Sequence, residues 1–80
     1  SPESPQIALY PHPARGSFFL QFNEEKQRHI ALLDLGGRVL SRYSTQLSLE
    51  KIDIPGIQPG MYIVKISDAR NVITKKLQII

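Results

Sequence analysis

The sequence contains no cysteine and no tryptophan among its 80 residues. Without cysteine, neither a disulfide nor a thiolate metal site can supplement the core of a small domain. A chain of this length supports one domain near the lower limit for a self-sufficient core. Its hydrophobic fraction of 41% is slightly below the usual globular range. We therefore expect a single folded domain without a large internal pocket.

Long apolar runs are also missing, since none approaches the roughly 20 residues that a membrane-spanning helix requires. The first residues, Ser1–Pro5, lack the features of a signal peptide and have the composition of a linker. We therefore expect a linker over residues 1–5 and a domain over residues 6–80. We interpret the chain as part of a longer protein, whose own export signal would lie upstream.

Clustered charge of one sign is a third absence. The net charge is +3, with ten basic residues scattered among seven acids. The three Phe and three Tyr mostly fall within strand-like patterns, where burial explains them. A nucleic-acid-binding domain usually gathers basic residues on one face with stacking aromatics between them. We therefore do not expect nucleic acid as a partner.

The clearest structural signal is the stretch Pro59–Ser67, which opens with a Pro-Gly turn and continues in residues that favour β-strands. Side chains alternate between the two faces of a strand, so Tyr62, Val64 and Ile66 share one apolar face. The opposite face is apolar only in its first half and ends at Lys65. This pattern predicts an interior strand of a two-layer β domain, with the lysine reaching the rim.

Other apolar or alternating runs predict further strands, separated by polar or Gly-containing turns. They cover residues 6–10, 17–22, 29–35, 38–44, 46–54 and 72–80. With the central stretch they predict an all-β fold, a seven-stranded antiparallel immunoglobulin-like β-sandwich. A small closed barrel is the alternative architecture.

Two irregularities are expected within these strands. Pro11 and Pro13 should end the first strand, because proline donates no ladder hydrogen bond. In the fifth strand, Leu49 lies at an odd position and Ile52 at an even one. A one-residue slip exchanges the faces of a strand, so this change of phase predicts a bulge or break near Glu50-Lys51.

No constellation of residues indicates catalysis, and we expect neither a catalytic residue, a cofactor nor a metal site. The two histidines, His12 and His29, stand alone, whereas a metal site needs several converging ligands. The pair Gly36-Gly37 lacks the Lys-Ser or Lys-Thr that completes a phosphate-binding loop. The domain itself is therefore predicted not to be an enzyme.

The pair Lys75-Lys76 supports two interpretations. The charges can simply keep an edge strand from pairing with other molecules, or they can form a basic patch that a receptor reads. Alternation places Lys75 on the face of Ile73, Leu77 and Ile79. If the last strand is exposed, its free backbone groups can also dock a partner by strand addition.

Four segments follow one another along the chain, namely residues 9–16, 32–39, 52–65 and 74–77. Taken in this order they resemble one family, the type A C-terminal sorting domains of the type IX secretion system (Por secretion system), and the resemblance covers about residues 6–80. The first segment carries His12 where the family usually has Asn. The turn residues of these motifs are Pro11, Pro13, Gly16, Asp34 and Gly37.

The resemblance implies a transport signal that directs an exported cargo across the outer membrane. It implies passage through the periplasm, then location at the outer membrane and cell surface or secretion. The implied partners are the type IX translocon and its shuttle proteins, a sortase-like peptidase that cuts near residues 1–5, and an anionic lipopolysaccharide joined to the cargo. The residues implied for signal recognition are Gly60, Tyr62, Lys75, Lys76, Leu77, Gln78, Ile79 and Ile80.

Two other functions remain open from the residues alone. One is an immunoglobulin-like accessory or adhesive module of a secreted or surface protein. The other is a small carbohydrate-binding module, which would need several exposed aromatics on one platform, whereas this chain offers only Phe19 or Tyr43.

Overall fold

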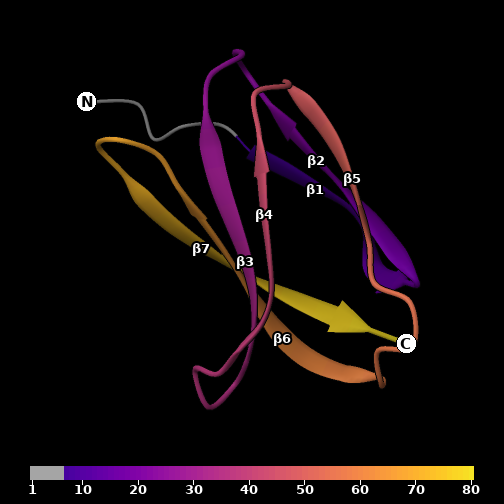
Figure 1. The fold of residues 1–80 in the computed structure, drawn as a ribbon. Coiled ribbons are helices and arrows are strands. Elements are labelled where there is room, and N and C mark those ends of the chain that lie inside the picture. The colour runs from indigo at the N-terminus through magenta and orange to yellow at the C-terminus, as the bar shows by residue number, and fades with distance from the viewer. Residues whose placement is uncertain (1–6) are drawn as a thin grey trace.

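A computed structural model describes residues 7–80, which form an all-β fold (Figure 1). The linker predicted for residues 1–5, and Gln6 at the start of the first predicted strand, lie outside the described residues. The seven strands are β1 (Ile7–Arg15), β2 (Ser17–Phe22), β3 (Arg28–Asp34), β4 (Val39–Thr45), β5 (Leu49–Asp53), β6 (Gly60–Ser67) and β7 (Val72–Ile79). The predicted all-β sandwich is confirmed.

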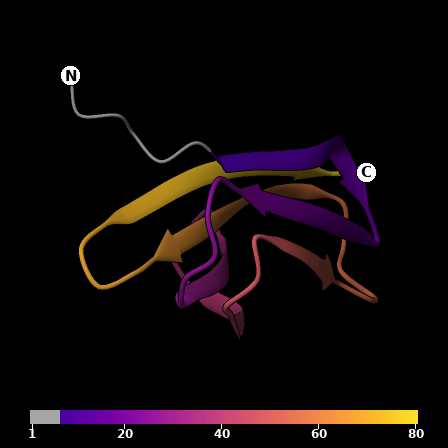
Figure 2. The same ribbon diagram turned by 90° about the horizontal axis from the view of Figure 1, so that it is seen from above.

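The strands follow the spatial order β4-β3-β6-β7-β1-β2-β5. One layer holds β4, β3, β6 and β7, and the other holds β2 and β5. Strand β1 belongs to both layers: Ile7–Tyr10 pair antiparallel with β2, whereas Ala14 pairs parallel with Ile79 of β7. Figure 2 shows the later part of β1 beside the end of β7. The first and last strands of the chain thus hold the two layers together.

The core lies between the layers and follows the alternation predicted for β6. Val64 is fully buried, Ile66 is nearly so, and Tyr62 is half-buried against the same cluster. Strand β3 pairs with β4 on one side and β6 on the other, which confirms its interior position. The buried apolar residues are Ala14, Phe18, Leu20, Phe22, Ile30, Leu32, Ile52, Ile54, Val64, Ile66, Leu77 and Ile79.

The prediction that Pro11 and Pro13 end the first strand was wrong. Strand β1 continues through both prolines to Arg15, and its pairing is interrupted only between Tyr10 and Arg15, where it crosses between layers. A crossing segment has few ladder partners to serve, so the missing amide donors cost little there. The peptide bonds that precede the two prolines are cis.

The bulge predicted near Glu50-Lys51 is also absent, because β5 pairs with β2 in unbroken register from Leu49 to Asp53. The phase change arises because Leu49 is 46% exposed and does not belong to the core. The even face of β5 points inward instead, and Glu50 on that face accepts a hydrogen bond of 2.6 Å from the hydroxyl of Thr45.

The irregular register lies between β3 and β4, where Leu32 pairs with Ser41 but Leu33 pairs with Val39. Leu40 is therefore the extra residue on β4, and its side chain is 41% exposed. A bulge of this kind bends a strand and increases its twist.

The sandwich stays open between β4 and β5, the two ends of the strand order. In residues 7–80 these strands do not pair through their backbones. Side chains connect them, since the Tyr43 hydroxyl donates to the carbonyl oxygen of Asp53 at 3.3 Å, and Thr45 bonds Glu50. The alternative of a closed barrel is therefore not realised.

Burial on β7 predicts unequal effects of two substitutions on the same strand. Leu77→Ala removes a fully buried side chain and should lower the free energy of unfolding by about 2–5 kcal/mol. The matched control Val72→Ala, at a side chain 62% exposed, should change it by less than about 0.5 kcal/mol. Urea unfolding measures both, and equal losses would contradict the described packing of β7.

Candidate functional site

The structure brings together most of the residues implied for signal recognition, at one end of the β6–β7 hairpin. Gly60 pairs with Ile79, and Tyr62 pairs with Leu77, with Gln78 between these two partners. Motifs separated in the sequence therefore form adjacent rungs of one ladder, close to the end of the chain (Figure 1).

Gly60 and Tyr62 shape this end of the hairpin. Gly60 has a φ of 153°, which residues with a Cβ rarely adopt, so glycine suits the entry into β6. The Tyr62 ring packs half-buried against the core, and its hydroxyl donates to the carbonyl oxygen of Gln58 at 2.6 Å. The tyrosine thereby ties the loop before β6 to the strand that follows it.

Lys75 and Lys76 lie on opposite faces of β7 and do not form one patch. Lys75 is opposite Val64, is half-buried and lies on the core side with Leu77, as alternation predicted. Lys76 is opposite Ile63, is exposed and lies on the outer side. A partner that approaches the outer face of this sheet therefore meets Lys76 and not Lys75.

The final residues of the last strand are not an open edge. The backbone amide of Ile80 donates to the carbonyl oxygen of Ala14 at 2.9 Å. The amide of Gln78 donates to Nε2 of His12 at 3.3 Å. Strand β1 thus covers the end of β7, and His12 caps a strand amide there, in a position where the resemblance implied Asn.

Earlier along β7 the outer edge stays open to other partners. The amide of Asp68 donates to the carbonyl oxygen of Asn71, so these two residues form a hydrogen-bonded pair. Hydrogen-bonded and non-hydrogen-bonded pairs alternate along an antiparallel hairpin, so Val72, Thr74 and Lys76 belong to the non-hydrogen-bonded pairs. The backbone groups of Val72, Thr74 and Lys76 consequently point away from β6. No strand within residues 7–80 pairs with them.

Among the remaining motif residues, Asp34, Gly37 and Gly16 lie at turns, whereas Pro11 and Pro13 lie within β1. A single carboxylate oxygen of Asp34 accepts hydrogen bonds from the backbone amides of Gly36 and Arg38, both at 2.9 Å. Gly37 has a φ of 91° and Gly16 a φ of 67°, values that favour glycine. Pro11 and Pro13 lie in the segment of β1 that crosses between layers. These residues position strands and offer no reactive group.

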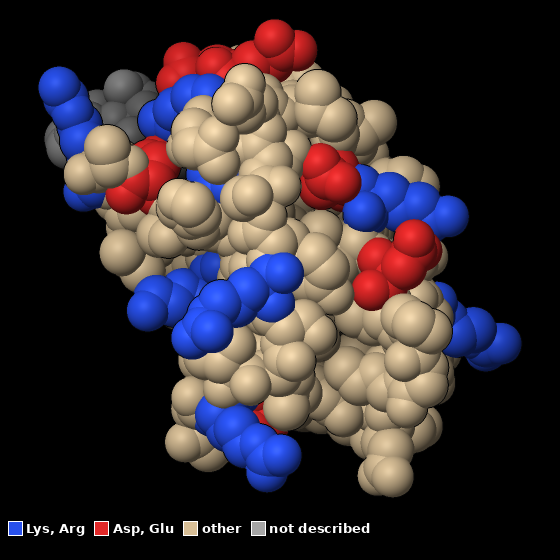
Figure 3. Space-filling view, in the orientation of Figure 1, with Lys and Arg blue, Asp and Glu red and all other residues tan. Residues whose placement is uncertain are grey.

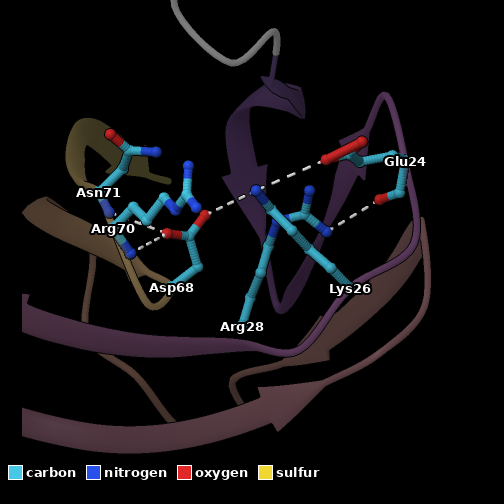
Figure 4. A network of polar contacts seen from close by, with 6 residues as sticks. All are labelled: Glu24, Lys26, Arg28, Asp68, Arg70 and Asn71. Atoms are coloured by element: carbon cyan, nitrogen blue, oxygen red, sulfur yellow. Dashed lines mark hydrogen bonds and ion pairs between the residues drawn. The ribbon is translucent and has the colours of Figure 1, made fainter.

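A polar network joins the β2–β3 loop to the β6–β7 turn (Figure 4). Lys26 lies 3.0 Å from one oxygen of Asp68 and 3.5 Å from Glu24. The other Asp68 oxygen accepts hydrogen bonds from the backbone amides of Arg70 and Asn71, both at 2.8 Å. The amide of Arg70, then Lys26 and Asn71, lower the pKa of Asp68 from 3.8 to about 2.

Arg28 anchors the same corner and was missed by the sequence analysis. It is only 3% exposed, its guanidinium lies 4.0 Å from the centre of the Phe22 ring, and one of its nitrogens donates to the carbonyl oxygen of Glu24 at 3.0 Å. The sequence did contain a signal for its burial. Arg28 lies two residues before Ile30, so alternation places both side chains on the inward face of β3. A cation stacked on an aromatic face and bonded to a carbonyl can be buried at little cost.

The described residues offer no site for metal catalysis, since no three His, Asp or Glu side chains between residues 7 and 80 converge. Nor does that part of the chain contain a helix that is long and apolar enough to cross a membrane.

Comparison with protein families identifies the chain. The model of the secretion system C-terminal sorting domain matches residues 8–80, which is nearly the whole chain. The chain belongs to this family. The domain is thus a C-terminal sorting signal for type IX secretion, and the accessory-module alternative is not favoured. A search of curated proteins finds no match.

Membership in the family also limits the chemistry of the domain. A sorting-signal domain is not catalytic. It interacts with the type IX secretion machinery and directs export across the outer membrane, to the cell surface or the medium.

The hydroxyl and the ring of Tyr62 make separate contributions to the free energy of unfolding. In the sorting domain, Tyr62→Phe keeps the half-buried ring but removes the hydrogen bond to Gln58. The free energy of unfolding should fall by about 1 kcal/mol, the net value of such a bond. Tyr62→Ala should lower it further, by about 2 kcal/mol or more, since it also removes ring packing. Equal urea midpoints for both variants would contradict this division.

The lowered pKa of Asp68 predicts a pH-dependent contribution to stability. Its carboxylate is favoured in the folded state, so its contribution is full above about pH 4 and disappears as the pH falls through about 2. Asp68→Asn should therefore be less stable than the wild type near neutral pH, and the difference should disappear only below about pH 2. Urea midpoints measured across this range test the prediction, and a difference that does not vary with pH would contradict it.

Proposed function

We propose that the secretion machinery recognises the folded sorting domain at the end of the β6–β7 hairpin and along the open edge of β7. The ladder that joins Gly60 and Tyr62 to Ile79 and Leu77 carries this proposal. It places the residues implied for recognition, Gly60, Tyr62, Lys75, Lys76 and residues 77–80, in one small region. The free backbone groups of Thr74 and Lys76 lie beside it.

Strand addition is the proposed mode of contact. An extended segment of a translocon or shuttle protein would bond the outward groups of Val72, Thr74 and Lys76, while the exposed Lys76 ammonium fixes its position. Backbone bonds supply affinity in such complexes and side chains supply register. The half-buried Lys75 would contribute mainly through the packing of its stem.

The proposed route of the cargo begins in the periplasm and ends at the outer membrane, on the cell surface or in the medium. Residues 1–5 would form the linker, and a sortase-like peptidase would cut near them. The released cargo would then be joined to an anionic lipopolysaccharide. A folded domain that carries its own recognition surface is compatible with removal after transport, because the cargo need not contribute to that surface.

A reporter fusion tests the sorting function. Residues 1–80 are attached to the C-terminal end of a periplasmic reporter, in a host with a type IX system and in the same host without its translocon. Reporter should reach the surface or the medium only in the competent host. Reporter retained in the periplasm of both hosts, with the domain folded, would contradict the proposal.

In that assay, Lys76→Ala should reduce export about tenfold while leaving the melting temperature nearly unchanged, because exposed charges contribute little to stability. Lys51→Ala is the matched control, since Lys51 is also exposed but lies on β5 in the other layer. Equal export of the two variants would show that Lys76 is only a solvated charge. Deleting residues 77–80 should abolish export, although it also removes buried Leu77 and Ile79.

A further inference from the structure

The outer face of the sheet formed by β4, β3 and β6 presents two cations around a small residue. Ala31 on β3 is directly opposite Arg42 on β4 and directly opposite Lys65 on β6. Side chains of directly opposite residues project from the same face, with Cβ atoms about 4.5–5.5 Å apart. The two long basic side chains therefore flank a methyl group and leave space above it.

A shallow groove of about 240 Å³ occupies this position. Arg42 and Lys65 contribute to its walls, together with the apolar side chains of Leu33 and Val39. Val39 in the groove wall is 37% exposed, and Met61, further along the same face of β6, is 38% exposed. The face thus combines cations with accessible hydrocarbon, as the surfaces that bind other proteins often do.

The two cations are not neutralised within residues 7–80. Neither Arg42 nor Lys65 forms an ion pair there, whereas Lys51 on the other layer lies 3.9 Å from Asp53. The described acids lie in loops and turns (Glu24, Glu25, Asp68), on β5 (Glu50, Asp53) and at the end of β3 (Asp34). Asp34 is three residues from Ala31, so alternation places it on the opposite face of β3. Figure 3 shows blue side chains gathered at mid-height in its left half, with red ones above them and to their right.

We propose that this groove docks an acidic segment of a partner protein of the secretion machinery, with a carboxylate seated above Ala31 between Arg42 and Lys65. The guanidinium can hold a carboxylate through two parallel hydrogen bonds, and the ammonium adds a second charge. Apolar side chains of the partner would lie on Leu33 and Met61. This inference rests on the proposed sorting function and adds a second contact surface to it.

The number of charges favours a protein over an anionic membrane. Binding to lipid headgroups typically uses clusters of four to eight basic residues. Along this face the described strands supply Arg42, Lys65 and, one strand further, the exposed Lys76 opposite Ile63. These cations are fewer than a membrane-binding surface typically has. Because they surround an apolar groove, they suit a protein surface that is both acidic and apolar.

Paired charge reversals in the reporter fusion test the proposal. Arg42→Glu with Lys65→Glu should reduce export at least about tenfold, since two central contacts of an interface are lost. The matched control, Lys51→Glu with Arg70→Glu, changes the net charge equally but lies away from the groove, and its export should stay within about twofold of the wild type. Urea midpoints verify that both variants fold. Wild-type export of the groove variant would overturn the proposal.

A binding measurement keeps the inference separable from the sorting function. The purified chain is titrated with a peptide of alternating Glu and Leu, and amide shifts are followed by NMR. Shifts should centre on Ala31, Arg42 and Lys65, and should be absent with the Gln-for-Glu peptide and with the groove variant. If the fusion is not exported but these shifts appear, the sorting function fails and the acidic-segment site stands.

Two outcomes of these measurements would overturn the proposed site. One is the absence of shifts at the groove with the acidic peptide. The other is binding to phosphatidylglycerol vesicles that the groove variant loses, without peptide shifts, which would assign the groove to a membrane surface.

Discussion

The architecture depends on one strand that serves two sheets. The first half of β1 completes the ladder of β2, and its second half completes the end of β7. Ala14, at the second contact, is fully buried, and a larger side chain there would separate strands that must stay within hydrogen-bonding distance. Without this crossing, no backbone pairing within residues 7–80 would join the layer of β2 and β5 to the rest, and core packing, loops and side-chain contacts such as the Tyr43 and Thr45 hydrogen bonds would remain.

The same crossing shapes the proposed recognition region. It covers the last amides of β7, opposite Gly60, and leaves a short stretch of edge open from Val72 to Lys76. The register of β6 against β7 then sets which side chains accompany that edge. Position along a ladder, more than any single residue, determines what a partner can contact.

Much of this fold was predictable from alternation alone. Val64 and Ile66 face the core as predicted, and the opposite orientations of Lys75 and Lys76 follow from the same period of two. Alternation fails where hydrophobicity and burial diverge. Leu49 is as apolar as any core residue but lies on an uncovered face, whereas Arg28 is buried because Phe22 and a carbonyl receive its charge.

Pairings across the chain were not predictable in this way. Proline indicates that a ladder lacks a donor at Pro11, but not whether the strand stops or crosses to another sheet. The recognition residues were implied by a family resemblance, and only the register showed that Gly60 and Ile79 are neighbours. Contacts between distant segments depend on packing choices that local sequence does not contain.

The pairing of the first strand with the last also has a consequence for timing. Within the domain, β1 is synthesised first and β7 last, so the proposed recognition edge cannot assemble until the whole domain has been synthesised. A protein that is cut short or trimmed before β7 lacks the partner of both β6 and the end of β1. A chain that ends before β7 therefore cannot present the edge on which the proposed recognition depends.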